Sequence, residues 1–487
     1  MGNLPRRSVL ALLGAAGLTG VTGTAWGAPP SPSAPPPADG TASAPSVAAE
    51  TFAPPPGGWR AVAEDVRRET QWAWRSYVDK AFGHDQIKPV SGGFEEFFVD
   101  GHPMGLTVVE ALDTLWFMEL DAEFAQGLKW VHDNLDFDVN ASFQVFETNI
   151  RMLGGLLSAY HVSGDPKLLE LARDLGDRLL VAFTKSPTGI PYRYVNLRTG
   201  AVSQPETNLA ETGTYITEFG MLSRWTGDRK YFNAAKKAFK YTFDRRSSLD
   251  LLPWDVHAET GAWRNRTATV GPPADSYYEY LFDGWKLFGD ADLKRWYDVL
   301  IAGINQRQAE TVGGNLWFAQ VDAFTGRRVS RSQSELASFM GGLFAQAGDV
   351  ARGRAYHDSW TKVQDRYGVL PEGISYPSLN ATSVGNQLRP EYADAAFFLW
   401  MHTNDELYRN RAYTHYQQMK RTSKTRFGYT ILSDVTTTPK RQGDFCPGYW
   451  WSEQLKYYWL IFGDSPRFDY RDNYLSTEGN VFRGAKR

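Results

Sequence analysis

The stretch Tyr160–Ala172, "YHVSGDPKLLELA", contains the pattern that decides the fold. An apolar helix end is followed by Gly164 and Asp165, and an amphipathic helix comes next. Glycine is favoured just past the end of a helix because it adopts left-handed backbone angles freely. Aspartate is favoured before a helix because its carboxylate accepts hydrogen bonds from free N–H groups. The stretch therefore predicts a helical hairpin.

The same phrase recurs along the chain, with its aspartates 56 to 63 residues apart. The other copies are "LSRWTGDRKYFNAA" (222–235), "WKLFGDADLKRWY" (285–297), "FAQAGDVARGRAY" (344–356), "MHTNDELYRNRAY" (401–413) and "YWLIFGDSPRF" (458–468). This period predicts an array of helical hairpins, and it fits an open solenoid and a closed ring equally well. The helix before each turn is the more apolar one, so in a ring it would lie inside. One short strand is expected, within residues 428–434.

The bulk composition narrows the possible functions. The 487 residues carry 52 basic and 55 acidic side chains, a net charge of -3, which argues against a nucleic-acid or anionic-membrane partner. Aromatic residues are 14% of the chain, which suits either sugar stacking or helix packing. No HExxH, GxSxG or Walker motif occurs, so zinc hydrolysis, a serine nucleophile and nucleotide binding lack support. The single Cys446 rules out an internal disulfide.

The N-terminal region predicts export. Residues 1–28 combine Arg6 and Arg7 with an apolar run, as in a bacterial twin-arginine signal peptide. The run is shorter than the ~20 residues that span a bilayer, so a membrane anchor is the weaker interpretation. Residues 29–58 are rich in proline and small residues and predict a linker. We expect a secreted protein with one folded domain over residues 59–487 and no membrane association after signal removal.

Charged residues occur within apolar segments near the starts of several predicted helices. Glu147 and Arg151 lie four residues apart, and the other carboxylates of this kind are Glu110, Asp113, Glu211, Glu218, Asp275, Glu391, Asp394 and Glu453. One interpretation is stabilisation of helix N-termini, worth about 0.3–1 kcal/mol each. The other is convergence in a central pit. Paired carboxyl groups perform glycoside hydrolysis, and clustered oxygens suit Ca²⁺.

Five segments in order, "GLTVVEALDTLWFMEL", "FETNIRMLGGLLSAYHVSGD", "ADSYYEYL", "LRPEYADAAFFLW" and "SEQLKYYWLIF", carry a family resemblance. The chain resembles glycoside hydrolase family 47, the class I α-mannosidases, over nearly the whole predicted domain. The resemblance implies an all-α fold, an (αα)7 barrel, which would close the ring. It also implies Ca²⁺-dependent, inverting removal of terminal α-1,2-linked mannose from mannose-rich glycans.

The resemblance also implies roles for individual residues. Glu147 matches the general acid, Asp275 the second catalytic carboxylate and Glu391 the general base. Thr477 matches the Ca²⁺ ligand. Residues that match substrate-binding positions are Arg151, Glu211, Arg389, Asp394, Tyr449, Glu453 and Glu478. The implied partner is a mannose-containing oligosaccharide or glycoprotein glycan, and we expect a monomer.

The chain departs from the family pattern at four places near these segments, one of which is the loss of a histidine in "STEGNV" (476–481). Pro273 stands where an arginine is common, Glu335 replaces a histidine and Pro447 replaces a glutamate. We expect these residues to shape the sugar subsites. Two other interpretations stay open: a mannose-binding, lectin-like protein with little turnover, and a helical-barrel epimerase or lyase. The set Glu147, Asp275 and Glu391 favours hydrolysis, because binding alone needs no acid and base.

Overall fold

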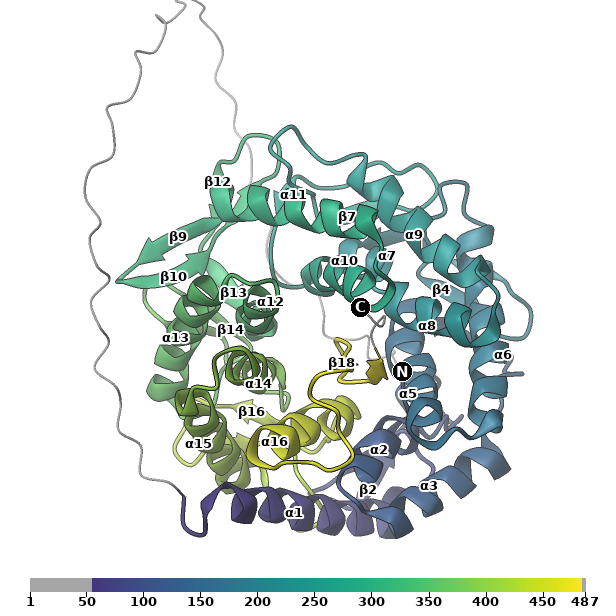
Figure 1. The fold of residues 1–487 in the computed structure, drawn as a ribbon, viewed down its shortest axis with the longest axis vertical. Helices are drawn as coiled ribbons and strands as arrows, with labels where there is room; N and C mark the ends of the chain where they lie inside the picture. Colours follow the sequence, from purple (N-terminus) through teal and green to yellow (C-terminus); the bar gives the residue numbers. More distant parts are fainter. Residues whose placement is uncertain (1–54, 484–487) are drawn as a thin grey trace, which may run out of the picture. The chain divides into compact units, whose positions relative to one another are not determined.

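The computed structural model describes residues 55–483, and in this part of the chain seven helices form an inner ring (Figure 1). They are α2 (Leu106–Phe117), α5 (Gly154–Ser163), α8 (Ile216–Thr226), α10 (Asp275–Phe288), α12 (Met340–Gln346), α14 (Glu391–Thr403) and α16 (Leu455–Phe462). Most residues of α10 and α14 and all residues of α16 are buried. These are the helices that precede the turns in the repeat, so the expectation that the more apolar helix lies inside is confirmed.

Seven outer helices surround this ring in the same part of the chain. They are α1 (Gly58–Ala81), α3 (Asp121–Asn134), α6 (Pro166–Thr184), α9 (Lys230–Phe243), α11 (Ala291–Arg307), α13 (Val350–Tyr367) and α15 (Glu406–Ser423). Each packs against the inner helix of its own hairpin, and α1 packs against α16. This last contact joins the two ends of the described chain. The ring is therefore closed, as an (αα)7 barrel, and the open solenoid is excluded.

The Gly-Asp turns have the predicted geometry in most repeats. Gly164, Gly227 and Gly289 end their helices with φ values of 70°, 75° and 69°. The side chain of Asp165 accepts a hydrogen bond from the N–H of Lys167 at 2.9 Å, as an N-cap does. These local interactions fix where each inner helix stops and the outer one begins.

Two parts of the ring depart from the repeat. The α2–α3 hairpin has no Gly-Asp turn; it bends at Glu119, whose φ is 55°. The last turn, at Gly463 and Asp464, leads into the C-terminal hairpin rather than into a helix. The outer partner of α16 is instead α1, from the other end of the described chain. Five of the six turns found in the sequence therefore join an inner helix to an outer helix, and the barrel has seven helix pairs.

Short strands form a second feature that the sequence mostly did not predict. They are β1 (Gln86–Lys88), β2 (Gly93–Glu95), β3 (Ser142–Gln144), β4 (Tyr194–Asn196), β5 (Val202–Ser203), β6 (Glu206–Asn208), β7 (Asp255–His257), β8 (Thr267–Ala268), β9 (Ala309–Val312), β10 (Asn315–Phe318), β11 (Gln320–Asp322), β12 (Arg328–Ser330), β13 (Ser332–Ser334), β14 (Gly373–Ser375), β15 (Asn380–Ser383), β16 (Leu432–Asp434), β17 (Arg441–Gln442), β18 (Asn473–Leu475) and β19 (Val481–Arg483). The strand expected within residues 428–434 corresponds to β16.

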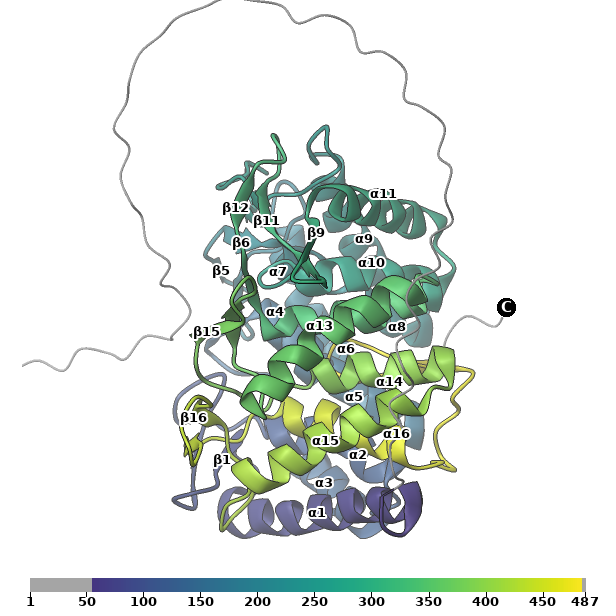
Figure 2. The same cartoon turned by 90° about the vertical axis from the view of Figure 1, so that its left-hand side faces the viewer.

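These strands pair antiparallel in sheets of two or three and decorate the barrel rather than build it. Figure 2 shows the labelled strands β1, β5, β6, β11, β12, β15 and β16 along one end of the barrel. Four of the sheets combine strands from different connections between helices: β3 with β4 and β5, β6 with β7, β8 with β11 and β12, and β13 with β14 and β15. The strands therefore tie successive helix pairs together at this end.

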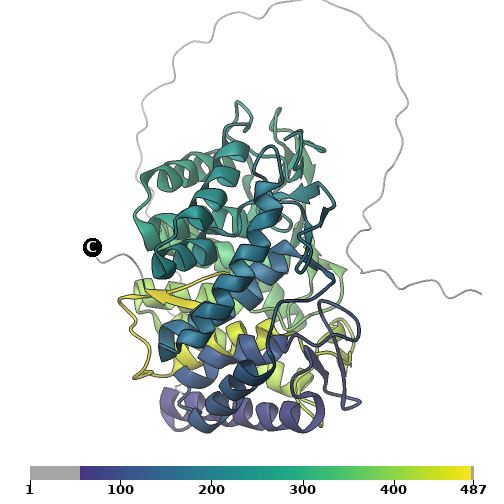
Figure 3. The same cartoon turned by 90° about the vertical axis from the view of Figure 1, so that its right-hand side faces the viewer.

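The C-terminal hairpin lies inside the ring. Strands β18 and β19 pair in the register Asn473↔Arg483, and β19 packs against α5. Figure 1 places β18 within the ring of inner helices, and Figure 3 shows the same yellow hairpin in side view. The connecting residues 476–480, "STEGN", are thereby brought to the barrel interior. This is the segment that contains Thr477 and Glu478.

The predicted signal peptide over residues 1–28 and most of the predicted linker over residues 29–58 lie outside the described residues. Within residues 55–483, none of the helices has the length and apolar character needed to cross a membrane.

Candidate active site

The predicted site residues gather where the inner helices begin. Strands β3, β6 and β13 lead directly into three short helical segments: α4 (Val145–Glu147), α7 (Leu209–Gly213) and η2 (Glu335–Phe339). Each segment then runs on toward an inner helix. Carboxylates near these starts therefore face the axis of the barrel at the end that carries the strands.

Glu147 and Arg151 stand on an irregular part of their helix. Glu147 ends α4, and the next segment, η1 (Thr148–Leu153), is π-helical before the α-helix resumes as α5. π-Helical turns inside α-helices are found frequently at functional sites. The Nε atom of Arg151 lies 3.0 Å from Oε2 of Glu147. The Glu147 side chain is 24% exposed and that of Arg151 6%, so the carboxylate reaches the pit while the guanidinium lies behind it.

Arg151 is shared among several groups. Its Nε atom lies 3.7 Å from Oε1 of Glu110 and 3.9 Å from Oε1 of Glu478. Its guanidinium also stands over the rings of Phe97, at 4.5 Å, and Tyr449, at 5.2 Å. Glu110 is buried, and neither of its oxygens has a hydrogen-bond donor in the described structure. The arginine therefore offsets three carboxyl groups drawn from α2, α4 and the C-terminal hairpin.

A second arginine stands on the segment before α14. The Nε atom of Arg389 lies 3.1 Å from Oε2 of Glu372. Its guanidinium stands 5.4 Å from the ring centre of Tyr449. The Tyr449 hydroxyl donates to the carbonyl of Gln387 at 2.7 Å. Tyr449 therefore lies between the two arginines of the pit, and its hydroxyl holds the chain that leads into Glu391.

The backbone of this segment is in an unusual conformation. Leu388 has φ of 57°, the left-handed region that a branched residue rarely adopts. Strain of this kind persists where surrounding contacts hold it, and it is concentrated at functional sites. Here the Asn386 side chain accepts from the Leu388 N–H at 2.9 Å, and Gln454 donates to the carbonyl of Arg389 at 3.0 Å. These contacts fix the direction in which Glu391 enters α14.

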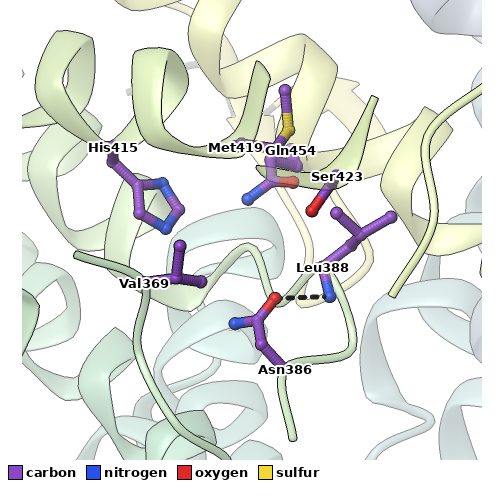
Figure 4. A pocket seen from close by; sticks show the side chains of 7 residues that line it. All are labelled: Val369, Asn386, Leu388, His415, Met419, Ser423 and Gln454. Carbon is purple, nitrogen blue, oxygen red and sulfur yellow. Dashed lines mark hydrogen bonds between the residues drawn. The ribbon is translucent and has the colours of Figure 1, made fainter. Parts of the chain in front are cut away.

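A small cavity lies behind the same segment (Figure 4). The residues lining it are Val369, Asn386, Leu388, His415, Met419, Ser423 and Gln454. His415 accepts from or donates to the Tyr458 hydroxyl at 2.7 Å through Nδ1, and burial lowers its pKa to about 4. The imidazole is therefore neutral at physiological pH. This cavity therefore belongs to the packing that supports the segment before Glu391, and it is not part of the pit.

Asp275 and Glu391 are each the first residue of an inner helix, α10 and α14. Oδ1 of Asp275 accepts from the N–H of Ser276 at 3.1 Å. Oε2 of Glu391 is buried without a hydrogen-bond donor in the described structure, while the residue as a whole is partly accessible. Both carboxyl groups interact electrostatically with Arg389. The start of an inner helix thus places each carboxyl group at the pit.

Burial shifts the pKa values of this cluster in one direction. Burial raises the pKa of Asp275 to about 6, of Glu391 and Glu478 to about 7, and of Glu218 and Glu279 to about 8. It also raises the pKa values of Glu110, Glu211, Glu335, Asp394 and Glu453 above their ordinary range. Neighbouring carboxylates reinforce most of these shifts. These buried carboxyl groups therefore keep protons that the same groups would lose in water.

The remaining predicted residues fall into two groups. Glu211, on α7, lies 2.8 Å from Arg193 Nη2 and also accepts from the Gln144 amide at 2.8 Å. Glu453 and Glu478 are in hydrogen-bond contact with each other, and Asp394 accepts from the Tyr457 hydroxyl. Glu211 also interacts electrostatically with Glu147, and Glu453 and Asp394 interact electrostatically with Glu391.

Thr477 is the residue predicted to bind Ca²⁺. Its hydroxyl donates to Glu279, which leaves the hydroxyl oxygen free to face a cation. Oε2 of the adjacent Glu478 is buried without a donor, and the surrounding carboxyl groups repel one another. Within the described residues, no group of three or more acidic, histidine or cysteine side chains is placed to bind a metal directly. The residues fit a hard cation held by Thr477 and water, with the carboxyl groups around it.

A buried ion pair fixes the segment that carries Thr477. Lys456 Nζ lies 2.7 Å from Oδ2 of Asp113, and its side chain is fully buried. The same ammonium group donates to the carbonyl of Gly479. The Ser158 hydroxyl donates to Asp113 at 2.6 Å and accepts from the N–H of Val481 at 2.9 Å. The loop between β18 and β19 is thereby anchored to α2, α5 and α16.

Some residues of the site were not predicted from the sequence. Glu279 stands one turn after Asp275 on α10, and this spacing was a signal that could have identified it. Arg193, Glu372 and Phe97 come from loops distant in sequence, and they carry no local signal. Glu335 was identified in the sequence only as a departure from the family pattern, where it replaces a histidine. In the structure it is in hydrogen-bond contact with Glu391.

Comparisons with known proteins agree with one another. The family model for glycosyl hydrolase family 47 matches residues 69–484. The chain is 33% identical to "Alpha-mannosidase I MNS5" of Arabidopsis thaliana over 86% of this chain and 76% of that protein. It is 35% identical to "Endoplasmic reticulum mannosyl-oligosaccharide 1,2-alpha-mannosidase" of Rattus norvegicus over 80% of this chain and 63% of that protein. The fold is similar to that of "alpha-1,2-mannosidase from Trichoderma reesei", with a TM-score of 0.81, 24% identity, and coverage of 87% of this chain and 99% of the other.

Proposed function

The chain belongs to glycosyl hydrolase family 47 and is a glycoside hydrolase of the α-1,2-mannosidase type, and we propose that it removes terminal α-1,2-linked mannose residues with inversion. The single observation that carries this proposal is the arrangement of the pit. Glu147, partly exposed at the end of α4, pairs with Arg151 and interacts with Glu478, which in turn interacts with Arg389. Arg389 is also the arginine with which Asp275 and Glu391 interact. Inverting hydrolysis requires one carboxyl group that protonates the leaving oxygen and a second that activates water on the opposite face of the sugar.

The proposed reaction assigns one proton transfer to each side of the bond. Glu147 gives its proton to the departing glycosidic oxygen as the C1–O bond breaks. Glu391 takes a proton from the water that attacks C1 from the opposite face, so the products are β-mannose and the shortened glycan. Asp275 is the second carboxyl group on the acid side of the reaction, and burial raises its pKa to about 6. Arg151 and Arg389 orient these groups through the contacts described above.

We further propose that the bound sugar rests against Tyr449 and is oriented by Glu211, Asp394, Glu453 and Glu478. Thr477 would hold Ca²⁺ through its hydroxyl and main-chain carbonyl. When bound, the ion supplies positive charge among the crowded carboxyl groups and coordinates sugar hydroxyls. Family membership is consistent with a metal-dependent mannosidase.

The proposed partner is the mannose-rich glycan of an oligosaccharide or glycoprotein, acted on by a monomer. We also propose that the protein is exported by a bacterial twin-arginine route, because Arg6 and Arg7 precede a short apolar run. The balanced net charge of -3 supports a neutral ligand rather than a nucleic acid.

The experiment that tests the activity is mannose release from α-1,2-, α-1,3- and α-1,6-mannobiose in the presence of Ca²⁺. We expect release from the α-1,2 isomer at a rate at least ten times that from the other two. Equal rates on all three would contradict the linkage assignment. Binding of the α-1,2 isomer without release, measured by calorimetry, would replace the proposal with the mannose-binding alternative.

A further inference from the structure

Glu335 is a buried carboxyl group with few partners of its own. It is the first residue of η2, and it is 1% exposed. Its N–H donates to the carbonyl of Glu372 at 3.1 Å, which fixes its backbone. Oε1 accepts from the Ser338 hydroxyl at the long distance of 3.4 Å, and Oε2 is buried without a donor in the described structure. A carboxyl group in this position is costly unless it is protonated or paired.

The group that faces Glu335 is a second carboxyl. The η2 segment packs against α14, and the side chains of Glu335 and Glu391 are in hydrogen-bond contact. Oε2 of Glu391 is also buried without a donor. Two ionised carboxylates at this separation repel each other strongly, and neither provides a hydrogen atom. A single proton between them removes one charge and supplies the missing donor.

The other charged and titratable groups near Glu335 and Glu391 do not replace the shared proton. Arg389 faces both carboxyl groups, but its Nε is paired with Glu372 at 3.1 Å. The remaining titratable groups that interact with Glu391 from the packed elements are acidic or phenolic: Glu279, Asp394, Tyr449 and Glu453. The positive charge of Arg389 is thus shared among several carboxyl groups, and a shared proton relieves the repulsion between Glu335 and Glu391, which are in hydrogen-bond contact.

We propose that Glu335 stays protonated and donates its proton in a hydrogen bond to Glu391, and so acts as the positioning residue of the general base. This inference rests on the proposed function, because it takes Glu391 to be the group that activates water. The hydrogen bond favours the ionised form of Glu391, which a base requires, and fixes the orientation of its carboxylate. The proton of Glu335 does not enter the reaction; the proton from water goes to Glu391.

The test compares two variants by the pH dependence of kcat on α-1,2-mannobiose. In Glu335→Gln the amide still donates to Glu391. We therefore expect kcat within about threefold of the wild type and no change in the pH at which kcat falls on the acidic side of the profile (the acid limb). In Glu335→Leu the donor is lost. We expect kcat to fall at least tenfold at pH 6 and the acid limb to move up by about one to two pH units, with KM nearly unchanged.

Two results would overturn the proposal: an acid limb that stays in place in Glu335→Leu, or a loss in Glu335→Gln as large as in Glu335→Leu. Glu218→Gln is the matched control. Glu218 is a buried inner-helix glutamate whose two oxygens accept from Tyr280 and Asn149, so neither depends on a proton shared with another carboxyl group. We expect it to leave the acid limb in place. Melting curves for each variant establish that it is folded.

A second measurement needs no activity. The infrared difference spectrum between the wild type and Glu335→Gln at pH 7 isolates the carboxyl group of residue 335. A protonated carboxyl band in the wild type supports the shared proton, and ionised carboxylate bands overturn it. If the wild type fails to release mannose, the proposed function fails, and this spectrum still decides the protonation state of Glu335.

Discussion

The Nε atom of Arg151 lies 3.0 Å from Oε2 of Glu147, across a π-helical turn that interrupts an otherwise regular inner helix. The same arginine faces Glu110 and Glu478 at 3.7 and 3.9 Å. Because Arg151 is shared among three carboxyl groups, it holds Glu147 in place without pairing with Glu147 alone. This relationship underlies the first of the predictions that follow.

The substitution Glu147→Gln removes the proposed proton donor while keeping its size. General acid catalysis contributes about 10²- to 10⁴-fold, so we expect kcat on α-1,2-mannobiose to fall by that amount with KM nearly unchanged. Dinitrophenyl α-mannoside is a suitable control, because its leaving group departs without protonation. We expect the variant to lose much less activity on that substrate. Full activity of Glu147→Gln on the disaccharide would contradict the assignment.

Removal of divalent cations tests the role of Thr477. We expect a chelator to abolish activity and to lower the melting temperature, because the carboxyl groups of the pit then repel one another without a cation. Adding Ca²⁺ in excess should restore both, and Mg²⁺ should restore less, since it demands more regular coordination. Thr477→Ala should require a higher Ca²⁺ concentration for the same melting temperature. A melting temperature that does not change with Ca²⁺ would exclude a site for this ion.

The buried Glu218 predicts a pH dependence of stability. Burial raises its pKa from the ordinary value of 4.5 to about 8, so the folded protein keeps a proton that the unfolded chain loses. This group therefore makes the folded state less stable as the pH rises from about 4.5 to about 8, and its effect is constant above that range. Glu218→Gln removes this ionisation.

We expect the free energy of unfolding of Glu218→Gln, relative to the wild type, to increase between pH 5 and pH 8. Urea titrations at the two pH values measure this difference. A relative stability that is the same at both values would show that Glu218 has an ordinary pKa in the folded protein.

The Lys456–Asp113 pair anchors the loop that carries Thr477. Removing one partner of a buried pair costs about 3–5 kcal/mol, because the other charge is left unpaired. Lys456→Met should therefore destabilise the protein by this amount. It should also weaken Ca²⁺ binding, because the loop that carries Thr477 loses the hydrogen bond from Lys456 to the Gly479 carbonyl. The double variant with Asp113→Asn should recover part of the stability. If the double variant is less stable than Lys456→Met, the charge left on Asp113 is not the cause.

The sequence predicted the parts of this protein that depend on local interactions. Gly164 and Asp165 terminate and start helices through their own backbone and side chain, so the hairpin repeat was visible without a structure. The hairpin that turns at Glu119 was missed because its left-handed residue is not a glycine. The strands were missed because they have two to four residues, too few for an alternating pattern to be recognised.

Closure of the ring and the details of the site depend on contacts between distant residues. Periodicity cannot show that α1 meets α16, and only the family resemblance predicted a closed barrel. The carboxylates near helix starts indicated a pit, yet their partners Arg193 and Glu372 come from the strand layer and have no signal in sequence. The contact of Glu335 with Glu391 likewise depends on how η2 packs against α14.

The central claim is that Glu147 and Glu391 act on opposite faces of a terminal mannose. Proton NMR of α-1,2-mannobiose hydrolysis, recorded before the product mutarotates, tests it most directly. Inversion predicts that the anomeric signal of β-mannose appears first and that the α-anomer grows only as equilibrium is reached. Initial formation of α-mannose would show retention and would contradict the assignment of Glu391 as a base that activates water.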